Sequence, residues 1–190
     1  LLAPLTTPQI GMTTPAIAVA GATHARGFGL TIKGPDLGVA WGAWQQDAPW
    51  EVAGAGAGCI AMRTEIFREI GAFEPMRIYG LEDIELSIRL WTLGYDIFVV
   101  PYSVVPHWFK AKGGAGVGWD DYLYNTLRTA LLHFDGKKAE RIMNHFHEYD
   151  AFAPAMTKLM TGDFMARRRQ IDAIRQRSTE DYCRRFDLPI

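Results

Sequence analysis

The sequence has few cysteines and almost no excess of charge. Among its 190 residues only Cys59 and Cys183 carry thiols. Two cysteines build neither a disulfide framework nor a cysteine-rich metal centre, which favours a reducing compartment and a cytoplasmic protein. The formal net charge is −1, so the surface is not strongly basic and nucleic acid is not an expected partner.

The sequence also lacks a long apolar run. The longest, "DIFVVPYSVV", is interrupted by Pro101 and falls short of the roughly 18 residues of a membrane helix. No signal peptide is visible, and the chain begins at Leu1 without Met, which suggests a trimmed or incomplete product. The apolar fraction of 48% is ordinary for a globular protein, and the length suits one core with appended helices.

The first part of the chain predicts an α/β unit. Within residues 1–50 the segment "AIAVAGA" is typical of one short buried strand, and the rest is expected to form loops. A second strand is predicted at 58–62, followed by a short helix "EIFREI" with Thr64 as N-cap. Apolar residues at helical spacing predict a helix over Glu82–Leu93, and "YDIFVV" predicts a strand that Pro101 ends.

The second part of the chain predicts helices only. Apolar residues recur at helical spacing over 119–134, 139–146 and 164–174, with a break at "FAPAM". We therefore divide the chain into an α/β part, residues 1–112, and an all-helical extension, residues 113–190. Asn125, Arg128 and His133 within it are expected to be helix-surface or hydrogen-bonded polar groups.

Glu82 and Asp83 begin the helix of the α/β part. Acidic residues are favoured at a helix start by the helix dipole and by capping, which is the ordinary structural interpretation. The functional alternative is that one carboxylate accepts a proton while the other orients a hydroxyl group. Gly80, just before them, would let a substrate reach the backbone.

His107 follows the predicted strand and precedes a glycine-rich stretch. A lone histidine in an aromatic setting is ordinarily a packed core residue. The glycines that follow predict a flexible loop, with Lys110 and Lys112 as cations at its base. A mobile loop with cations beside a histidine suits a metal-bound phosphate group, whereas the structural alternative is a linker into the helices.

The segment "AGAGAGC" spans Ala53–Cys59. Its glycines indicate tight backbone packing or close approach of a ligand to the main chain. The spacing fits neither the Walker pattern nor the dinucleotide-binding fingerprint. Cys59 is interpreted as a small packed residue, because no second catalytic group lies near it in sequence.

Taken in order, these segments resemble the second half of a GT-A glycosyltransferase, a Rossmann-like nucleotide-diphospho-sugar transferase fold. The closest likenesses are to bacterial family 2 glycosyltransferases and polypeptide N-acetylgalactosaminyltransferases. The resemblance runs from about Ala53 to Lys110. It is carried by "AGAGCIAMRTEIFREIGAFEP", by "YGLEDIELSIRLW", and by Pro101, Ser103, Val105, His107 and Phe109.

The resemblance implies a role for each matching residue. His107 is similar to the histidine that completes a divalent-metal site, for Mn²⁺ or Mg²⁺, under the sugar-nucleotide diphosphate. Ala57 and Gly58 resemble the backbone that lies against the donor sugar. Glu82 resembles the carboxylate that lies near the donor sugar or the acceptor. Asp83 stands where inverting family 2 enzymes place their catalytic base, which favours a reaction that inverts the anomeric configuration of the sugar. The loop with Lys110 and Lys112 resembles the lid over the diphosphate, with both lysines as phosphate contacts.

One departure from the family pattern concerns the metal site. Family members hold the metal with a DxD or DxH motif, and this sequence has none before the glycine-rich segment. The chain thus resembles the C-terminal portion of such an enzyme. The metal-binding motif would then lie upstream of this sequence, lie in a second chain, or have been lost. We expect a metal-dependent glycosyltransferase that uses a nucleotide sugar, such as a UDP-sugar, and an acceptor of unknown class: peptide, glycan, lipid-linked or small molecule. The helical extension would bind acceptor or form a homo-oligomer.

Two alternatives remain at this point. One is a non-catalytic binding or assembly module that keeps part of the GT-A fold. The other is a generic α/β domain with a helical extension, which would require the order of motifs from Ala53 to Lys110 to be chance.

Overall fold

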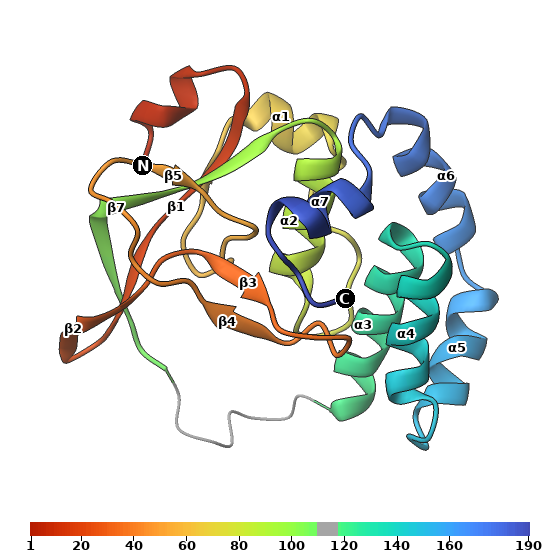
Figure 1. The fold of residues 1–190 in the computed structure, drawn as a ribbon. Helices are drawn as coiled ribbons and strands as arrows, with labels where there is room; N and C mark the ends of the chain where they lie inside the picture. Colours follow the sequence, from red (N-terminus) through yellow and green to blue (C-terminus); the bar gives the residue numbers. More distant parts are fainter. Residues whose placement is uncertain (110–117) are drawn as a thin grey trace.

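The computed structural model describes residues 1–109 and 118–190, in which a strand-rich N-terminal part precedes a run of helices (Figure 1). The strands are β1 (Ile10–Val19), β2 (Ala22–Gly27), β3 (Leu30–Ile32), β4 (Val39–Trp41), β5 (Trp50–Glu51), β6 (Ala61–Met62) and β7 (Asp96–His107). The helices are α1 (Thr64–Glu69), α2 (Glu82–Thr92), α3 (Trp119–His133), α4 (Gly136–Phe146), α5 (Phe152–Met160), α6 (Phe164–Ile174) and α7 (Thr179–Arg185).

β1 and β7 form the centre of the main sheet. They run parallel, and the strand order is β2-β1-β7-β5, with β6 also paired to β1. Ile10–Ala18 of β1 are buried without alternation, as expected of a strand covered on both faces. A separate antiparallel pair, β3 and β4, lies beside the main sheet. The expectation of mostly loops before residue 50 is therefore wrong, because four strands, β1 to β4, lie there.

The prediction that Pro101 ends its strand is also wrong. β7 continues to His107, and its register with β1 shifts between the pairs Pro15–Val100 and Ala16–Val104. Pro101 therefore lies in an irregular bulged segment that makes no ladder pairs with β1, where its missing N–H costs nothing. The continued strand brings His107 opposite Val19, at the far end of β1.

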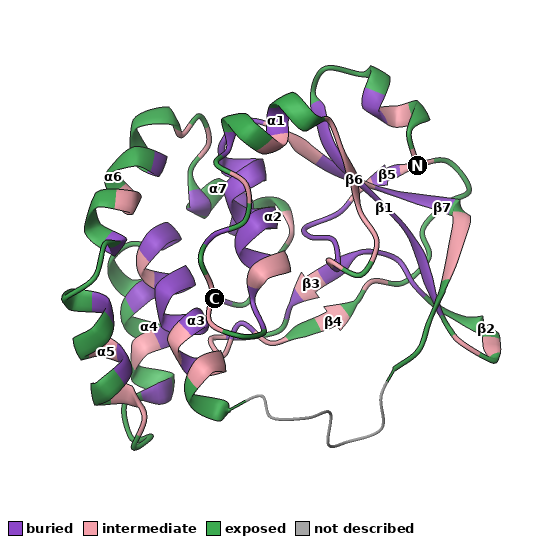
Figure 2. Ribbon diagram, turned by 180° about the vertical axis from the view of Figure 1, so that it is seen from behind, coloured by how far each residue is buried: buried purple, intermediate pink, exposed green. Residues whose placement is uncertain are grey.

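Helix α2 lies between two hydrophobic cores (Figure 2). Leu86, Leu90 and Leu93 pack in the core on the sheet side, together with strand residues such as Met12 and Val99. Ile84, Ile88 and Trp91 pack in the core on the other side, with helices α3 to α7 and with Leu30 and Ile32 of β3. Every residue from Ile84 to Thr92 is buried, which fixes α2 and hence the position of its N-terminus.

Other boundaries differ slightly from the sequence-based expectation. Strand β6 contains only Ala61 and Met62 of the predicted 58–62. Thr64 is the first residue of α1 and makes no capping hydrogen bond, and Arg63 stands at the cap position. Gly94 ends α2 as predicted, with φ of 101°.

The C-terminal part of the chain contains more helix than expected. The "FAPAM" segment starts α5 instead of breaking the helices, because Pro154 lies in the first turn, where backbone N–H groups have no intrahelical partner. The short helix α7 was not predicted. Asn125, Arg128 and His133 are buried. The predicted boundary at 112 lies outside the described residues.

No helix in the described ranges is long and apolar enough to cross a bilayer.

Candidate active site

The start of α2 presents two carboxylates at the end of a tightly turned loop. Gly80 and Leu81 have φ angles of 101° and 70°, and the helix begins at Glu82. The backbone N–H of Gly80 donates to Oε2 of Glu82 at 2.8 Å, and that of Ile84 donates to Oδ1 of Asp83 at 2.8 Å. Both carboxylates are therefore oriented by main-chain donors near a helix N-terminus, where negative charge is favourable.

One cavity brings together residues from three separate segments of the chain. Its volume is about 410 Å³, and predicted site residues from the glycine-rich segment, the α2 N-terminus and the end of β7 line it. These predicted residues are Ala57, Gly58, Glu82, Asp83 and His107. The remaining lining residues are Ile17, Trp41, Gly56, Tyr79 and Phe109.

Gly80 lines a smaller neighbouring cavity of about 140 Å³. This second cavity shares Tyr79, Glu82 and Asp83 with the first and is closed on another side by Tyr122 of α3. The two cavities therefore meet at the start of α2. Lys110 and Lys112, predicted as phosphate contacts, lie outside the described residues.

His107 stands at the exposed end of β7, against the glycine-rich segment. A Cβ atom built on Gly58 would lie 3.5 Å from Cδ2 of His107, so the main chain at Gly58 runs close past the imidazole. The ring centroids of His107 and Phe109 are 4.2 Å apart. The backbone carbonyl of His107 accepts from the N–H of Ala20 at 2.9 Å, which anchors the strand end.

Asp83 has the electrostatic character of a proton acceptor. Burial raises the pKa of its carboxyl group, and the negative charge of Glu82 raises it further, while hydrogen bonds from the backbone of Ile84 and Ala57 oppose the shift. A carboxylate with a raised pKa in a cavity holds a proton more readily than an ordinary one, as general bases require.

The described residues do not by themselves form a complete metal site. Within residues 1–109 and 118–190, no group of three His, Cys, Asp or Glu side chains is arranged to hold an ion. His107 is the nitrogen ligand available in the large cavity. A metal bound there would need further ligands from outside the described residues.

The site depends on two residues that sequence analysis did not single out. Oγ of Ser87 donates to the carbonyl of Asp83 at 2.7 Å and accepts from the N–H of Ala55 at 3.3 Å, so it joins α2 to the glycine-rich segment. Helical spacing from Asp83 was the available signal for Ser87. Trp41 reaches the cavity from β4, and no local pattern indicated it.

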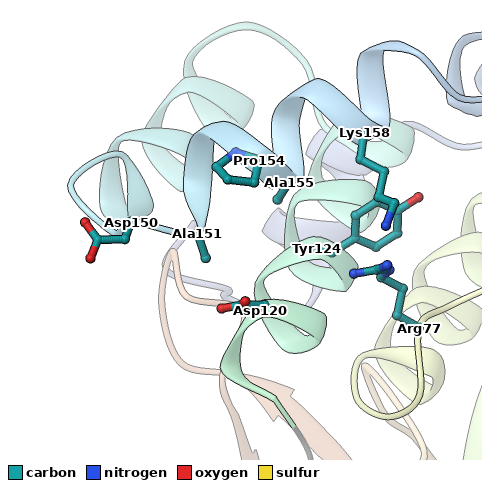
Figure 3. Close-up of a pocket in the computed structure, with 8 residues that line it drawn as sticks. All are labelled: Arg77, Asp120, Tyr124, Asp150, Ala151, Pro154, Ala155 and Lys158. Carbon is teal, nitrogen blue, oxygen red and sulfur yellow. The ribbon is translucent and has the colours of Figure 1, made fainter.

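Another cavity, of about 280 Å³, lies between α3 and α5 and contains none of the predicted site residues (Figure 3). Arg77, Tyr124 and Lys158 are among its lining residues, and the Arg77 guanidinium carbon is 5.0 Å from the centroid of the Tyr124 ring. Arg77 belongs to the loop before α2, but this cavity shares no lining residue with the two cavities at Glu82 and Asp83.

Comparison with known proteins confirms the predicted resemblance to GT-A glycosyltransferases. No family model matches the chain. Polypeptide N-acetylgalactosaminyltransferase 11 of Xenopus tropicalis is 31% identical over 123 residues, which cover 63% of this chain and 19% of that protein. A probable N-acetylgalactosaminyltransferase 8 of Caenorhabditis elegans is 41% identical over 76 residues, covering 38% and 18%.

The fold is shared with a solved member of this group. The crystal structure of GalNAc-T7 with UDP, GalNAc and Mn²⁺ superposes with a TM-score of 0.76 at 19% identity, over 97% of this chain and 36% of that one. The chain is thus GT-A glycosyltransferase-like. It spans about a fifth of the length of the curated relatives it matches and about a third of the GalNAc-T7 chain.

Proposed function

We propose that this chain is the acceptor-side half of a glycosyltransferase that moves a sugar from a nucleotide-diphosphate sugar to an acceptor. One observation carries the proposal: Gly58, Asp83 and His107, from three separate segments, line one cavity. The fold around that cavity is similar to GalNAc-T7, whose structure was solved with UDP, GalNAc and Mn²⁺.

In the proposed reaction Asp83 is the general base. Its carboxylate accepts the proton of an acceptor hydroxyl or thiol as that atom attacks the anomeric carbon of the donor sugar. The bond between the anomeric carbon and the diphosphate oxygen breaks, and the nucleoside diphosphate leaves. Attack from the opposite face inverts the anomeric configuration. Glu82, held by the Gly80 N–H, orients the sugar or acceptor hydroxyl, and the backbone at Ala57 and Gly58 lies against the donor sugar.

The donor side of the site is proposed to include a divalent cation, Mn²⁺ or Mg²⁺. Such an ion would neutralise the charge of the departing diphosphate. His107 would supply one ligand. The others would come from an acidic DxD-type segment upstream of this sequence or in a second chain, because the described residues offer no complete ligand set.

A non-catalytic binding module is the second candidate function. The incomplete ligand set is the observation that favours it. A module of this kind would keep the cavity and bind a glycan or partner without cleaving a nucleotide sugar.

A transfer assay separates the two candidates. This chain, together with the segment or second chain proposed to supply the remaining metal ligands, is incubated with Mn²⁺ and UDP-N-acetylgalactosamine, with water as the acceptor. Release of UDP is measured for the wild type and for Asp83→Asn and Glu65→Gln. Glu65 is an exposed acidic residue of α1, so Glu65→Gln is a control. The proposal expects release that Asp83→Asn abolishes and Glu65→Gln leaves unchanged. The product's anomeric configuration, followed by NMR, then tests inversion. If no tested nucleotide sugar, UDP-, GDP- or dTDP-linked, is cleaved, the binding module is favoured.

A further inference from the structure

The loop before α2, which places Tyr79 and Gly80 at the site, is held by the buried side chain of Asn125 on α3. Oδ1 of Asn125 accepts from the N–H of Arg77 at 2.7 Å. Nδ2 of Asn125 donates to the carbonyl oxygens of Arg77, Tyr79 and Gly80 at 2.9, 3.2 and 2.9 Å. Because Nδ2 carries two hydrogens, one of them is shared between acceptors, and both N–H donors of the amide are used on this loop.

Asn125 is the middle of a polar stripe on α3 that faces the same loop. Asp121, one turn before it, accepts from Nη1 of Arg77 at 3.0 Å. Arg128, about one turn after it, donates through Nη2 to Oε1 of Glu74 at 2.8 Å. Spacings of i, i+4 and i+7 place the three side chains on one helix face, so this face of α3 holds the loop at several points between Glu74 and Gly80.

The loop needs this support because its backbone is strained. Ile78 and Leu81 have φ angles of 27° and 70°, in a region that residues with a Cβ rarely adopt. Gly80 has φ of 101°, and a Cβ atom there would also lie 2.9 Å from Cδ2 of Tyr122. Conformations of this kind persist only when surrounding contacts determine them.

We infer that Asn125 is a positioning residue for the carboxylates at the start of α2, an inference that rests on the proposed function. Asn125 fixes the carbonyl of Gly80, and the N–H of Gly80 in turn holds Oε2 of Glu82. It also fixes the carbonyl of Tyr79, whose side chain lines both cavities at the site. Asn125 itself lines neither cavity and acts through the loop.

The test replaces Asn125 with aspartate and with serine, and uses Asn144→Asp as a matched control. Asn125→Asp keeps the shape and the Oδ1 acceptor but removes both donors and turns a carboxylate toward three carbonyl oxygens. Asn125→Ser retains one donor and is the milder change. Asn144 is exposed on α4, so Asn144→Asp makes the same chemical change away from the loop.

Two readouts are compared. One is amide hydrogen exchange over residues 73–92 of this chain, and the other is UDP release from UDP-N-acetylgalactosamine with Mn²⁺ by this chain together with the segment or second chain that supplies the remaining metal ligands. In Asn125→Asp, amides 77–82 should exchange at least about tenfold faster, while those of Leu86–Trp91 keep their protection. The kcat should fall by about tenfold or more, with KM for the donor within about twofold, because Gly58 and His107 are untouched. Asn125→Ser should be intermediate and Asn144→Asp unchanged.

The inference is overturned if amides 77–82 exchange in both Asn125 variants as they do in Asn144→Asp, or if kcat is unchanged while they exchange faster. If Asn125→Asp loses protection throughout α2, Asn125→Ser decides by the same two readouts. A wild-type chain that releases no UDP would contradict the proposed function and the positioning role with it. The exchange comparison would then show only whether Asn125 holds the loop.

Discussion

Replacing Glu85 with glutamine should destabilise the fold strongly at neutral pH, because it leaves a buried cation without its counter-ion. Glu85 and Arg89 are fully buried on α2 and form a bidentate pair, with Nε to Oε1 at 2.8 Å and Nη2 to Oε2 at 2.9 Å. Arg89 also donates to the carbonyls of Ile70 and Ala72, and so ties α2 to the end of α1.

The structure sets the size of the effect. Burial alone would raise the pKa of Glu85, but the charge of Arg89 and the hydrogen bond from His133 outweigh it and lower the pKa from 4.5 to about 2. The drop from 4.5 to about 2, at about 1.4 kcal/mol per pH unit, corresponds to about 3 kcal/mol. Breaking a buried pair by removing one partner costs a similar amount, about 3–5 kcal/mol.

His133 takes part as a neutral group. Burial lowers its pKa, with the charge of Glu85 opposing the shift. Nε2 lies 2.8 Å from Oε1 of Glu85, and Nδ1 has no partner among the described residues. Protonating Nδ1 would therefore bury an unsatisfied N–H donor, so we assign the neutral tautomer in which Nε2 donates to Glu85.

The assay is urea unfolding of the wild type, Glu85→Gln and Glu65→Gln, followed by circular dichroism from pH 7 down to about pH 3. Because the folded pKa of Glu85 is lowered, its stabilisation is complete above about 4.5 and is lost as pH falls toward about 2. Glu85→Gln should lose about 3 kcal/mol at pH 7. That difference should shrink steadily below about pH 4.5, while the exposed Glu65→Gln stays close to the wild type. A loss under about 1 kcal/mol at pH 7, or one that does not change with pH, would refute this reasoning.

Three further predictions follow from the site. Asp83→Asn should not reduce stability at pH 7. The pKa of Asp83 is raised in the folded state, so ionisation of its carboxylate as pH rises lowers the stability of the fold, and asparagine cannot ionise. A melting temperature below that of the wild type would contradict this. Ser87→Ala should cost about 1–3 kcal/mol, since the buried N–H of Ala55 loses its acceptor, and thermal unfolding unchanged within error would count against it. Tyr182→Phe should cost about 1–2 kcal/mol in urea unfolding, because the buried hydroxyl donates to the Ala53 carbonyl at 2.6 Å; an equal urea midpoint would show that this bond adds nothing.

Sequence patterns predicted the elements that local periodicity controls. Ile84, Ile88 and Trp91 at helical spacing, with Gly94 after them, located α2 within one residue. The order of motifs from Ala53 to Lys110 also singled out Ala57, Gly58, Glu82, Asp83 and His107, which line one cavity although Glu82 and His107 are far apart in sequence. Their roles in catalysis and metal binding stay predictions.

The rest depended on tertiary contacts that local patterns do not encode. Pro101 was expected to end a strand, but a bulge against β1 accommodates it and the strand continues to His107. Asn125 was expected to be an ordinary polar residue, and only the approach of the Arg77–Gly80 loop to α3 gives its amide four backbone bonds. Trp41 likewise reaches the cavity because the β3–β4 pair lies beside it.

The most direct test of the central claim is calorimetric binding of uridine diphosphate, with Mn²⁺ and with EDTA, to this chain together with the segment or second chain that supplies the remaining metal ligands. The wild type is compared with His107→Ala and His24→Ala. His24 is exposed on β2 and does not line the cavity, so it serves as the matched control. The account predicts binding that requires Mn²⁺, that is lost in His107→Ala and that is retained in His24→Ala. Binding unaffected by EDTA and by His107→Ala would contradict a donor site at His107. Absence of binding to uridine, guanosine and thymidine diphosphates alike would contradict the proposal that the cavity at His107 belongs to a nucleotide-sugar donor site.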